Sequence, residues 1–204
     1  MTNTIKNTQS QPKMGWIELI TGCMFAGKTE EFIRRLRKHY YGKRNVLAFK
    51  PSIDDRYDAE NIATHSGDVF PSFPVKDSKQ IREIYKRELE KQGHIDVVGI
   101  DEVQFLDTDV VQLINDLADE GVIVIVTGLD KDFKLGPFQN VDKLLYQAEY
   151  VDKLHAVCSI CGANANRSQR MVNGQPAKKT DPIILVSGKE SYEARCRFCY
   201  IPAK

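Results

Sequence analysis

The sequence lacks long hydrophobic runs and any excess of charge of one sign. No apolar stretch approaches the roughly 18 residues that span a bilayer, and the chain does not open with the pattern of a secretory signal peptide. Lys and Arg together number 29 and Asp and Glu 28, so no global field draws the chain toward nucleic acid or a membrane surface. We therefore expect a cytoplasmic protein whose partners are neither nucleic acids nor membranes.

Cysteine is also scarce, with five residues in the chain. Four of them form two C-x-x-C pairs toward the C-terminal end, namely Cys158, Cys161, Cys196 and Cys199. In a reducing compartment, four thiolates from two such turns suit a closed tetrahedral site for structural Zn²⁺. Buried free thiols and a redox pair are the alternatives. The polar segment between the pairs, held on a metal-stapled base, is interpreted as a lid over a ligand.

The fifth cysteine lies in a Gly-rich segment that matches G-x-x-x-x-G-K-[ST]: Gly22, Cys23, Met24, Phe25, Ala26, Gly27, Lys28 and Thr29. A predicted strand, residues 16–20, precedes it, and apolar residues at helical spacing follow it. In this context the segment is predicted to hold the phosphates of ATP or GTP on its backbone N–H groups. Lys28 is expected to reach the β- and γ-phosphates and the Thr29 hydroxyl to bind Mg²⁺. The alternative is a chance Gly-rich turn.

A second apolar strand ends in two acids, Asp101 and Glu102. This is the usual partner of a phosphate loop, in which the first carboxylate binds Mg²⁺ directly or through water. Glu102 is expected near the γ-phosphate, where it could take a proton from an attacking hydroxyl. The alternative makes Glu102 a helix-start acid favoured by the helix dipole. Arg56, in an irregular loop, could neutralise charge on a transferring phosphoryl group, although a lone loop arginine is usually only solvated.

Strands and helices alternate along the chain. Strands are predicted at residues 16–20, 46–49, 95–100 and 122–127, and helices at 30–41, 78–92, 107–120 and 143–148. The alternation predicts a three-layer α/β core around a parallel sheet. Helix 30–41 has a basic face made of Arg34, Arg35, Arg37 and Lys38. A polyanion site and a solvated face both explain it, and the balanced total charge favours the second.

Three segments are expected. Residues 1–13 are polar and are predicted to be a disordered leader, residues 14–150 form the nucleotide-binding α/β domain, and residues 151–204 form the zinc-binding part. Residues 150–157 are expected to lead out of the core, and residues 182–186 to form a strand.

With these pieces in place, the chain resembles the zinc-containing type II family of thymidine kinases. The resemblance runs from about Gly15 to Cys199 and rests on the phosphate loop and on five further motifs, which are residues 54–57 (DDRY), 101–105 (DEVQF), 128–133 (GLDKDF), 168–170 (SQR) and 187–196 (SGKESYEARC). It implies a RecA-like P-loop core with a small zinc-bearing lasso subdomain. It also implies transfer of the ATP γ-phosphate to the 5′-hydroxyl of thymidine, giving dTMP for DNA synthesis, with Mg²⁺, in a homotetramer inhibited by dTTP.

The resemblance also implies residue roles. Glu102 matches the catalytic base, Lys28 and Thr29 match the ligands of ATP and Mg²⁺, and Asp101 matches the acid on the metal side. The residues matched to the nucleoside site are Met24, Leu129, Phe133, Ser168 and Tyr192. Two other classes of function fit parts of the pattern: an ATP-driven nucleic-acid motor, against which the balanced charge counts, and a non-catalytic nucleotide-binding zinc module.

Overall fold

The structure is a computed structural model that describes residues 14–52, 61–64, 67–184 and 190–204. The predicted leader, residues 1–13, lies outside this part. The central sheet contains β1 (Trp16–Gly22), β2 (Val46–Pro51), β5 (Phe73–Val75), β6 (Val97–Ile100), β7 (Ile123–Leu129) and β8 (Tyr150–Leu154). Its strands lie in the order β5-β2-β6-β7-β1-β8, and every neighbouring pair is parallel. The predicted α/β class with a parallel sheet is confirmed.

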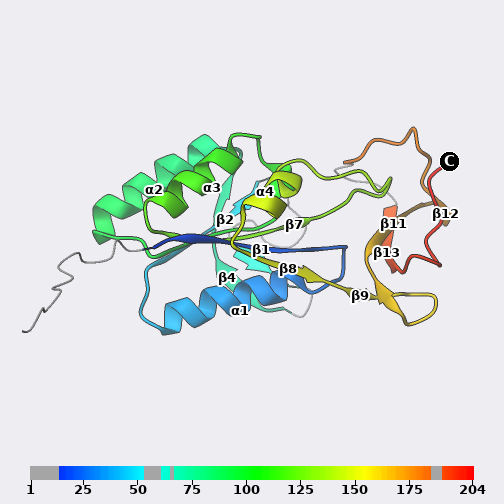
Figure 1. The fold of residues 1–204 in the computed structure, drawn as a ribbon, viewed down its shortest axis with the longest axis horizontal. Coiled ribbons are helices and arrows are strands. Elements are labelled where there is room, and N and C mark those ends of the chain that lie inside the picture. Colours follow the sequence, from blue (N-terminus) through cyan, green and yellow to red (C-terminus); the bar gives the residue numbers. More distant parts are fainter. Residues whose placement is uncertain (1–13, 53–60, 65–66, 185–189) are drawn as a thin grey trace, which may run out of the picture.

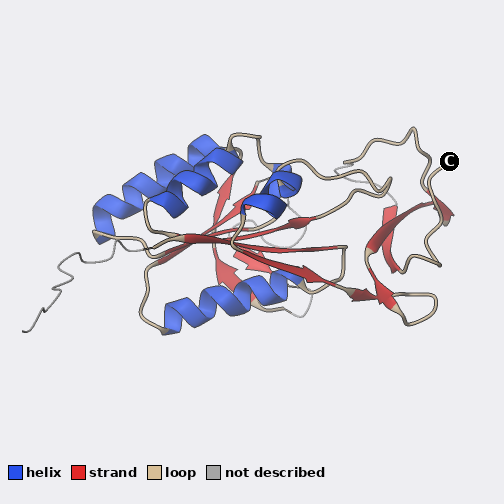
Figure 2. Cartoon of the chain, viewed as in Figure 1, coloured by secondary structure: helices blue, strands red, loops and turns tan. Residues whose placement is uncertain are grey.

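Helices cover both faces of this sheet (Figures 1 and 2). On one face lie α2 (Ser78–Gln92), α3 (Val110–Asp119) and α4 (Val141–Gln147); on the other lies α1 (Lys28–Tyr41), beside the short hairpin of β3 (Asn61–Ala63) and β4 (Val69–Pro71). Successive side chains of a strand point to opposite faces, so each apolar strand feeds both layers. In β7, Val124 and Val126 join the core beneath α2 and α3, while Ile123 and Ile125 join the core beneath α1.

The described residues 156–184 and 190–204 are called the C-terminal region here. It contains two small antiparallel sheets, one of β9 (Ala156–Val157) with β10 (Asn164–Ala165), the other of β11 (Arg167–Val172) between β12 (Gln175–Pro176) and β13 (Glu190–Arg195). Figure 1 shows this region at one end of the central sheet, on the right of the view. Within the described residues, no helix has the length and apolar character needed to cross a membrane.

Two expected features of this half of the chain are wrong. Residues 150–154 were expected to lead out of the core, but they form the edge strand β8, parallel to β1. Pro182, Ile183 and Ile184 were expected to begin a strand, but they form none; residues 185 and 186 lie outside the described part. The carbonyl of Pro182 accepts a hydrogen bond from the Arg170 guanidinium, so its partner is a side chain.

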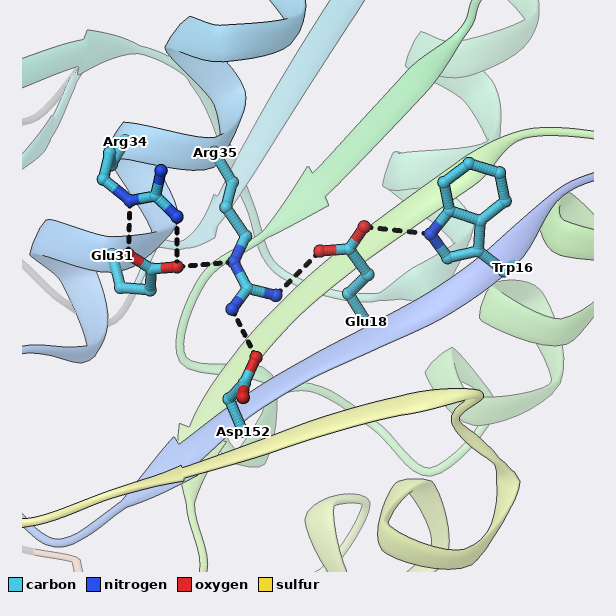
Figure 3. A network of polar contacts seen from close by, with 6 residues as sticks. All are labelled: Trp16, Glu18, Glu31, Arg34, Arg35 and Asp152. Atoms are coloured by element: carbon cyan, nitrogen blue, oxygen red, sulfur yellow. Dashed lines mark hydrogen bonds and ion pairs between the residues drawn. The ribbon is translucent and has the colours of Figure 1, made fainter.

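The basic face of α1 is neither a free polyanion site nor simply solvated. Arg35 donates to Glu18 of β1, to Glu31 of its own helix and to Asp152 of β8, and Arg34 also pairs with Glu31 (Figure 3). Arg37 pairs with Asp68. The Arg35 side chain is only 14% exposed. Through Arg35, the carboxylates of Glu18 in β1 and Asp152 in β8 therefore join α1 to the sheet.

Candidate active site

The phosphate-loop motif connects β1 directly to α1, as the sequence predicts. Gly22 has a φ of 142°, and a Cβ there would lie 2.4 Å from the Leu154 carbonyl oxygen of β8, so only glycine fits. Gly27, at φ 80°, precedes the first residue of the helix, Lys28. The buried Lys28 ammonium donates to the Cys23 carbonyl at 3.1 Å. The Lys28 side chain therefore folds over the phosphate loop, with its ammonium at the loop backbone.

A cleft of about 440 Å³ opens beside this loop. It is bounded by the loop and the start of α1, by the end of β2, by the β3 hairpin, by the acid pair after β6 and by β13. Its lining residues are Met24, Phe25, Ala26, Gly27, Lys28, Thr29, Glu30, Lys50, Asn61, Ile62, Ala63, Thr64, Asp101, Glu102 and Tyr192. Parallel strands end at the same edge of a sheet, which explains why segments so distant in sequence meet here.

The two acids are held by β7, the strand between β1 and β6. The Thr127 hydroxyl donates to Asp101 Oδ1 and accepts the backbone N–H of Glu102 at 3.0 Å. Thr127 is fully buried and Asp101 is buried, while Glu102 has a left-handed backbone, with a φ of 48°. Such a conformation is uncommon for a residue with a side chain and occurs where the surrounding structure enforces it. One buried hydroxyl thus fixes both acids at the cleft.

The residues predicted for the nucleoside site divide into two groups. Met24 and Tyr192 line the cleft. Ser168 does not line it, but its hydroxyl accepts the Met24 backbone N–H at 3.0 Å. Leu129 and Phe133 also lie outside the lining: Phe133 is 3% exposed, beneath the Arg170 guanidinium at 5.0 Å, and its carbonyl accepts the Tyr200 hydroxyl. These contacts join the end of β7 to the C-terminal region.

Gly22, Cys23 and Arg56 complete the predicted phosphate site. Gly22 and Cys23 precede the lining part of the loop. Cys23 is 1% exposed, its Sγ contacts the Ala165 carbonyl oxygen at 3.4 Å, and burial raises the pKa of its thiol. Arg56 lies outside the described residues, so the structure gives no position for it.

The four remaining cysteines gather into one cluster. The sulfurs of Cys158, Cys161, Cys196 and Cys199 all lie within 4.8 Å of one another. The Cys161 and Cys196 sulfurs are 3.6 Å apart, and a tetrahedral site with Zn–S bonds of about 2.3 Å places its sulfurs about 3.8 Å apart. Hydrogen bonds from the backbone, that of Cys199 first, lower the pKa of Cys196 against the opposing effect of burial. The donor set and its spacing therefore fit a structural zinc ion.

Sequence reasoning missed three polar residues of this site. In the sequence, Thr127 is only the last residue of a predicted apolar strand and Gln104 only part of a motif, yet the Gln104 side-chain amide donates to the Glu102 carboxylate. Lys50, at the end of β2, is buried in the cleft wall, and its ammonium donates to the Asn61 carbonyl at 2.9 Å. Their position at the carboxyl ends of parallel strands was the available signal.

Comparison with known proteins agrees with these features. A family model described as "Thymidine kinase" matches residues 15–200. The chain is 65% identical over 192 residues to a thymidine kinase of Mycoplasma capricolum subsp. capricolum, covering 94% of this chain and 91% of that protein. It is 57% identical over 196 residues to a thymidine kinase of Mesoplasma florum, covering 96% of each. The resemblance found in the sequence is confirmed: the chain belongs to the thymidine kinase family, whose members are enzymes that transfer phosphate.

Proposed function

We propose that the cleft transfers the γ-phosphate of ATP to the 5′-hydroxyl of thymidine, which yields dTMP and ADP. The observation that carries this proposal is that one cleft is lined by the phosphate loop, by the acid pair and by Tyr192 of the C-terminal region. A kinase needs these three parts together, because its catalysis consists of positioning two substrates and stabilising the charge between them. Membership of the thymidine kinase family supports the choice of nucleoside.

We assign the nucleotide side of the cleft to the phosphate loop. Backbone N–H groups of the loop and the N-terminus of α1 bind the phosphates, and Lys28 exchanges the Cys23 carbonyl for a phosphate oxygen. The Thr29 hydroxyl and the Asp101 carboxylate are oxygen ligands of the kind that Mg²⁺ prefers, and both line the cleft. Bound Mg²⁺ supplies positive charge to the β- and γ-phosphates. Arg56 is assigned to the same anionic groups on the strength of its motif.

We assign proton transfer to Glu102. As the 5′-oxygen of thymidine bonds to the γ-phosphorus, the bond from that phosphorus to the bridging oxygen of ADP breaks, and the hydroxyl proton passes to a Glu102 carboxylate oxygen. On the nucleoside side, Tyr192 and Met24 contact thymidine from the cleft wall. Ser168, Leu129 and Phe133 complete that side. Ser168 holds the loop at Met24 through its hydroxyl. Leu129 is the last residue of β7, and Phe133 packs beneath Arg170 of the C-terminal region.

The remaining assignments concern the cluster and the assembly. The four cysteines hold Zn²⁺ in a structural role, because a closed set of four thiolates has no open position for a substrate. The homotetramer, the inhibition by dTTP and the cytoplasmic location stay predictions from the family resemblance and the sequence.

The test combines a nucleoside panel with Glu102→Gln. ATP consumption should depend on thymidine, should be lower with deoxyuridine because one methyl group is worth about 1–3 kcal/mol, and should be negligible with deoxyguanosine. Glu102→Gln keeps the size of the side chain but removes the proton acceptor, so kcat should fall about 10²- to 10⁴-fold. Affinities for ATP and thymidine, measured by direct binding, should change far less.

The matched control is Glu83→Gln, an exposed position on α2, which should keep full turnover. Normal turnover in Glu102→Gln would remove Glu102 from the role of base. DNA-stimulated ATP hydrolysis without nucleoside phosphorylation would favour a motor, and the absence of any turnover would favour a binding module.

A further inference from the structure

Gln104 is a buried side chain whose two amide ends contact two parts of the site. It lies in the short 3-10 helix η1 (Val103–Phe105) that follows the acid pair, and it is 2% exposed. Its Nε2 donates to Glu102 Oε2, and its Oε1 accepts the backbone N–H of Leu129 at 3.3 Å. The side chain therefore bridges the assigned base and the end of β7.

The chemistry of the two partners fixes the orientation of the amide. A backbone N–H only donates, and an ionised carboxylate only accepts. A flipped amide would face oxygen toward oxygen at Glu102 and N–H toward N–H at Leu129. The orientation that donates to Glu102 is therefore the one that satisfies both contacts.

The packing around Gln104 leaves it little freedom. A Cβ on Gly128 would lie 2.9 Å from Gln104 Oε1 and 2.5 Å from Val141 Cγ2, so the absence of a side chain in β7 makes the space for the amide. On either side of Gln104, the carbonyls of Val103 and Leu106 accept the Asn140 side-chain amide at 3.1 and 3.0 Å. The backbone and the side chain of Gln104 are thus held independently.

We propose that Gln104 is a positioning residue for Glu102 in the phosphoryl-transfer reaction. Its N–H fixes one carboxylate oxygen, Oε2, so that the other oxygen, Oε1, is presented to the 5′-hydroxyl as the proton acceptor. Without this contact the Glu102 side chain samples other rotamers, and the fraction of complexes with a correctly placed base falls. The oxygen of the same amide accepts the Leu129 N–H, and this contact holds the Gln104 side chain in place. This inference rests on the proposed role of Glu102 as the base.

The test uses two substitutions with different consequences. Gln104→Met removes both hydrogen bonds at nearly constant length, whereas Gln104→Glu keeps an acceptor for the Leu129 N–H and turns a second carboxylate toward Glu102. Both should lower kcat about 10- to 100-fold, the range expected for losing one hydrogen bond to a charged group. KM values for ATP and thymidine should change less than about 3-fold, because the contact acts on the base and not on substrate binding. Gln112→Met, at an exposed position on α3, is the matched control and should keep full activity.

A double-mutant cycle separates positioning from a structural role. If Gln104 acts through the carboxylate, then Gln104→Met combined with Glu102→Gln should be no slower than Glu102→Gln alone. An equal further loss in that background would overturn the proposal, as would full kcat in a folded Gln104→Met or Gln104→Glu protein. Normal turnover in Glu102→Gln would overturn both this inference and the assignment of the base. If Glu102→Gln lowers kcat but neither Gln104 substitution does, the role of Gln104 would be overturned and the assignment of the base would stand.

Discussion

The central sheet and the C-terminal region bury different kinds of side chain. Both faces of the sheet carry Ile, Val, Leu and Phe, many of them fully buried, in two clusters that the helices cover. The cluster of the C-terminal region consists of cysteine and alanine, with Cys158, Cys196, Ala156, Ala165 and Ala194 as its members there. Burial of large branched side chains stabilises the first region, whereas alanine offers little apolar area. We therefore expect the second region to depend on the metal that its four clustered cysteines are proposed to hold.

The two regions meet at the phosphate loop. Cys23 belongs to the small-residue cluster of the C-terminal region, and Ala26 packs against it. Small side chains let the loop backbone approach closely, and the Ser168 hydroxyl then accepts the Met24 N–H. A loop assigned to ATP is thus supported on one side by the sheet and on the other by the region that carries Tyr192. Loosening the C-terminal region should therefore weaken the binding of both ATP and thymidine.

The largest difference between the two regions is expected when the metal is removed. Cys199→Ser, or chelation of the wild-type protein, should unfold the C-terminal region, because structural zinc contributes about 10–16 kcal/mol in zinc-finger peptides and no large core replaces it. Amide exchange in β11 and β13 should become fast while exchange in β6 and β7 stays slow. Thymidine binding should weaken more than ATP binding, since Tyr192 lies in β13.

Metal analysis should find about one zinc ion per wild-type chain. Arg197→Ala, a substitution at an exposed position in the same turn as Cys199 that removes no thiol, should keep the metal and most activity. Fully active protein without zinc would contradict the dependence of this region on metal.

The sequence predicted the sheet far better than the C-terminal region, for a physical reason. Strands β6 and β7 are buried on both faces, so they appear as nearly continuous apolar runs. The edge strand β8 is mostly exposed and reads YVDKL, with no apolar run to mark it. Strands β11 and β13 contain charged and polar residues and show no apolar pattern. They form because they pair with each other from distant parts of the chain, which no local pattern indicates.

The same distinction holds for the candidate site. The phosphate loop, the acid pair and the cysteine pairs are local patterns, and the structure brings the first two to one cleft and the cysteines to one cluster. The contacts of Thr127 with Asp101 and of Ser168 with Met24 join residues far apart in the chain. No spacing rule encodes such pairs, because they depend on strand order and register.

A milder perturbation of the contact between the regions is Ser168→Ala. It removes the acceptor of the Met24 N–H, a hydrogen bond worth about 1 kcal/mol, so KM values for ATP and thymidine should each rise about 5-fold. Ser191→Ala, at an exposed position on the paired strand β13, is the control and should leave both KM values unchanged. A rise in the KM for thymidine alone would contradict the role of Ser168 in holding the loop and would favour a direct contact with the nucleoside.

The smallest effect on catalysis is expected at Arg35 of α1, whose contacts join this helix to the sheet. Its guanidinium joins Glu18, Glu31 and Asp152, and a lysine cannot donate in three such directions from one planar group. Arg35→Lys should lower the free energy of unfolding by about 1–2 kcal/mol, as expected for the loss of charge-assisted hydrogen bonds, and should leave kcat unchanged. Arg37→Lys, on the same helix and paired only with Asp68 among carboxylates of the described residues, should cost less.

The acid dependence of stability provides a second measurement for the same pair of variants. Hydrogen bonds from Arg34 and then Arg35 lower the pKa of Glu31 from 4.5 to about 2, against the opposing effect of burial. A carboxyl group whose pKa is lower in the folded state stabilises the protein above its unfolded pKa, and this stabilisation is lost as pH falls from 4.5 toward 2. Arg35→Lys should therefore flatten the fall in denaturant midpoint across that range, whereas Arg37→Lys should keep the wild-type slope. Equal slopes in all three proteins would show that Arg35 does not lower the pKa of Glu31 in the folded protein.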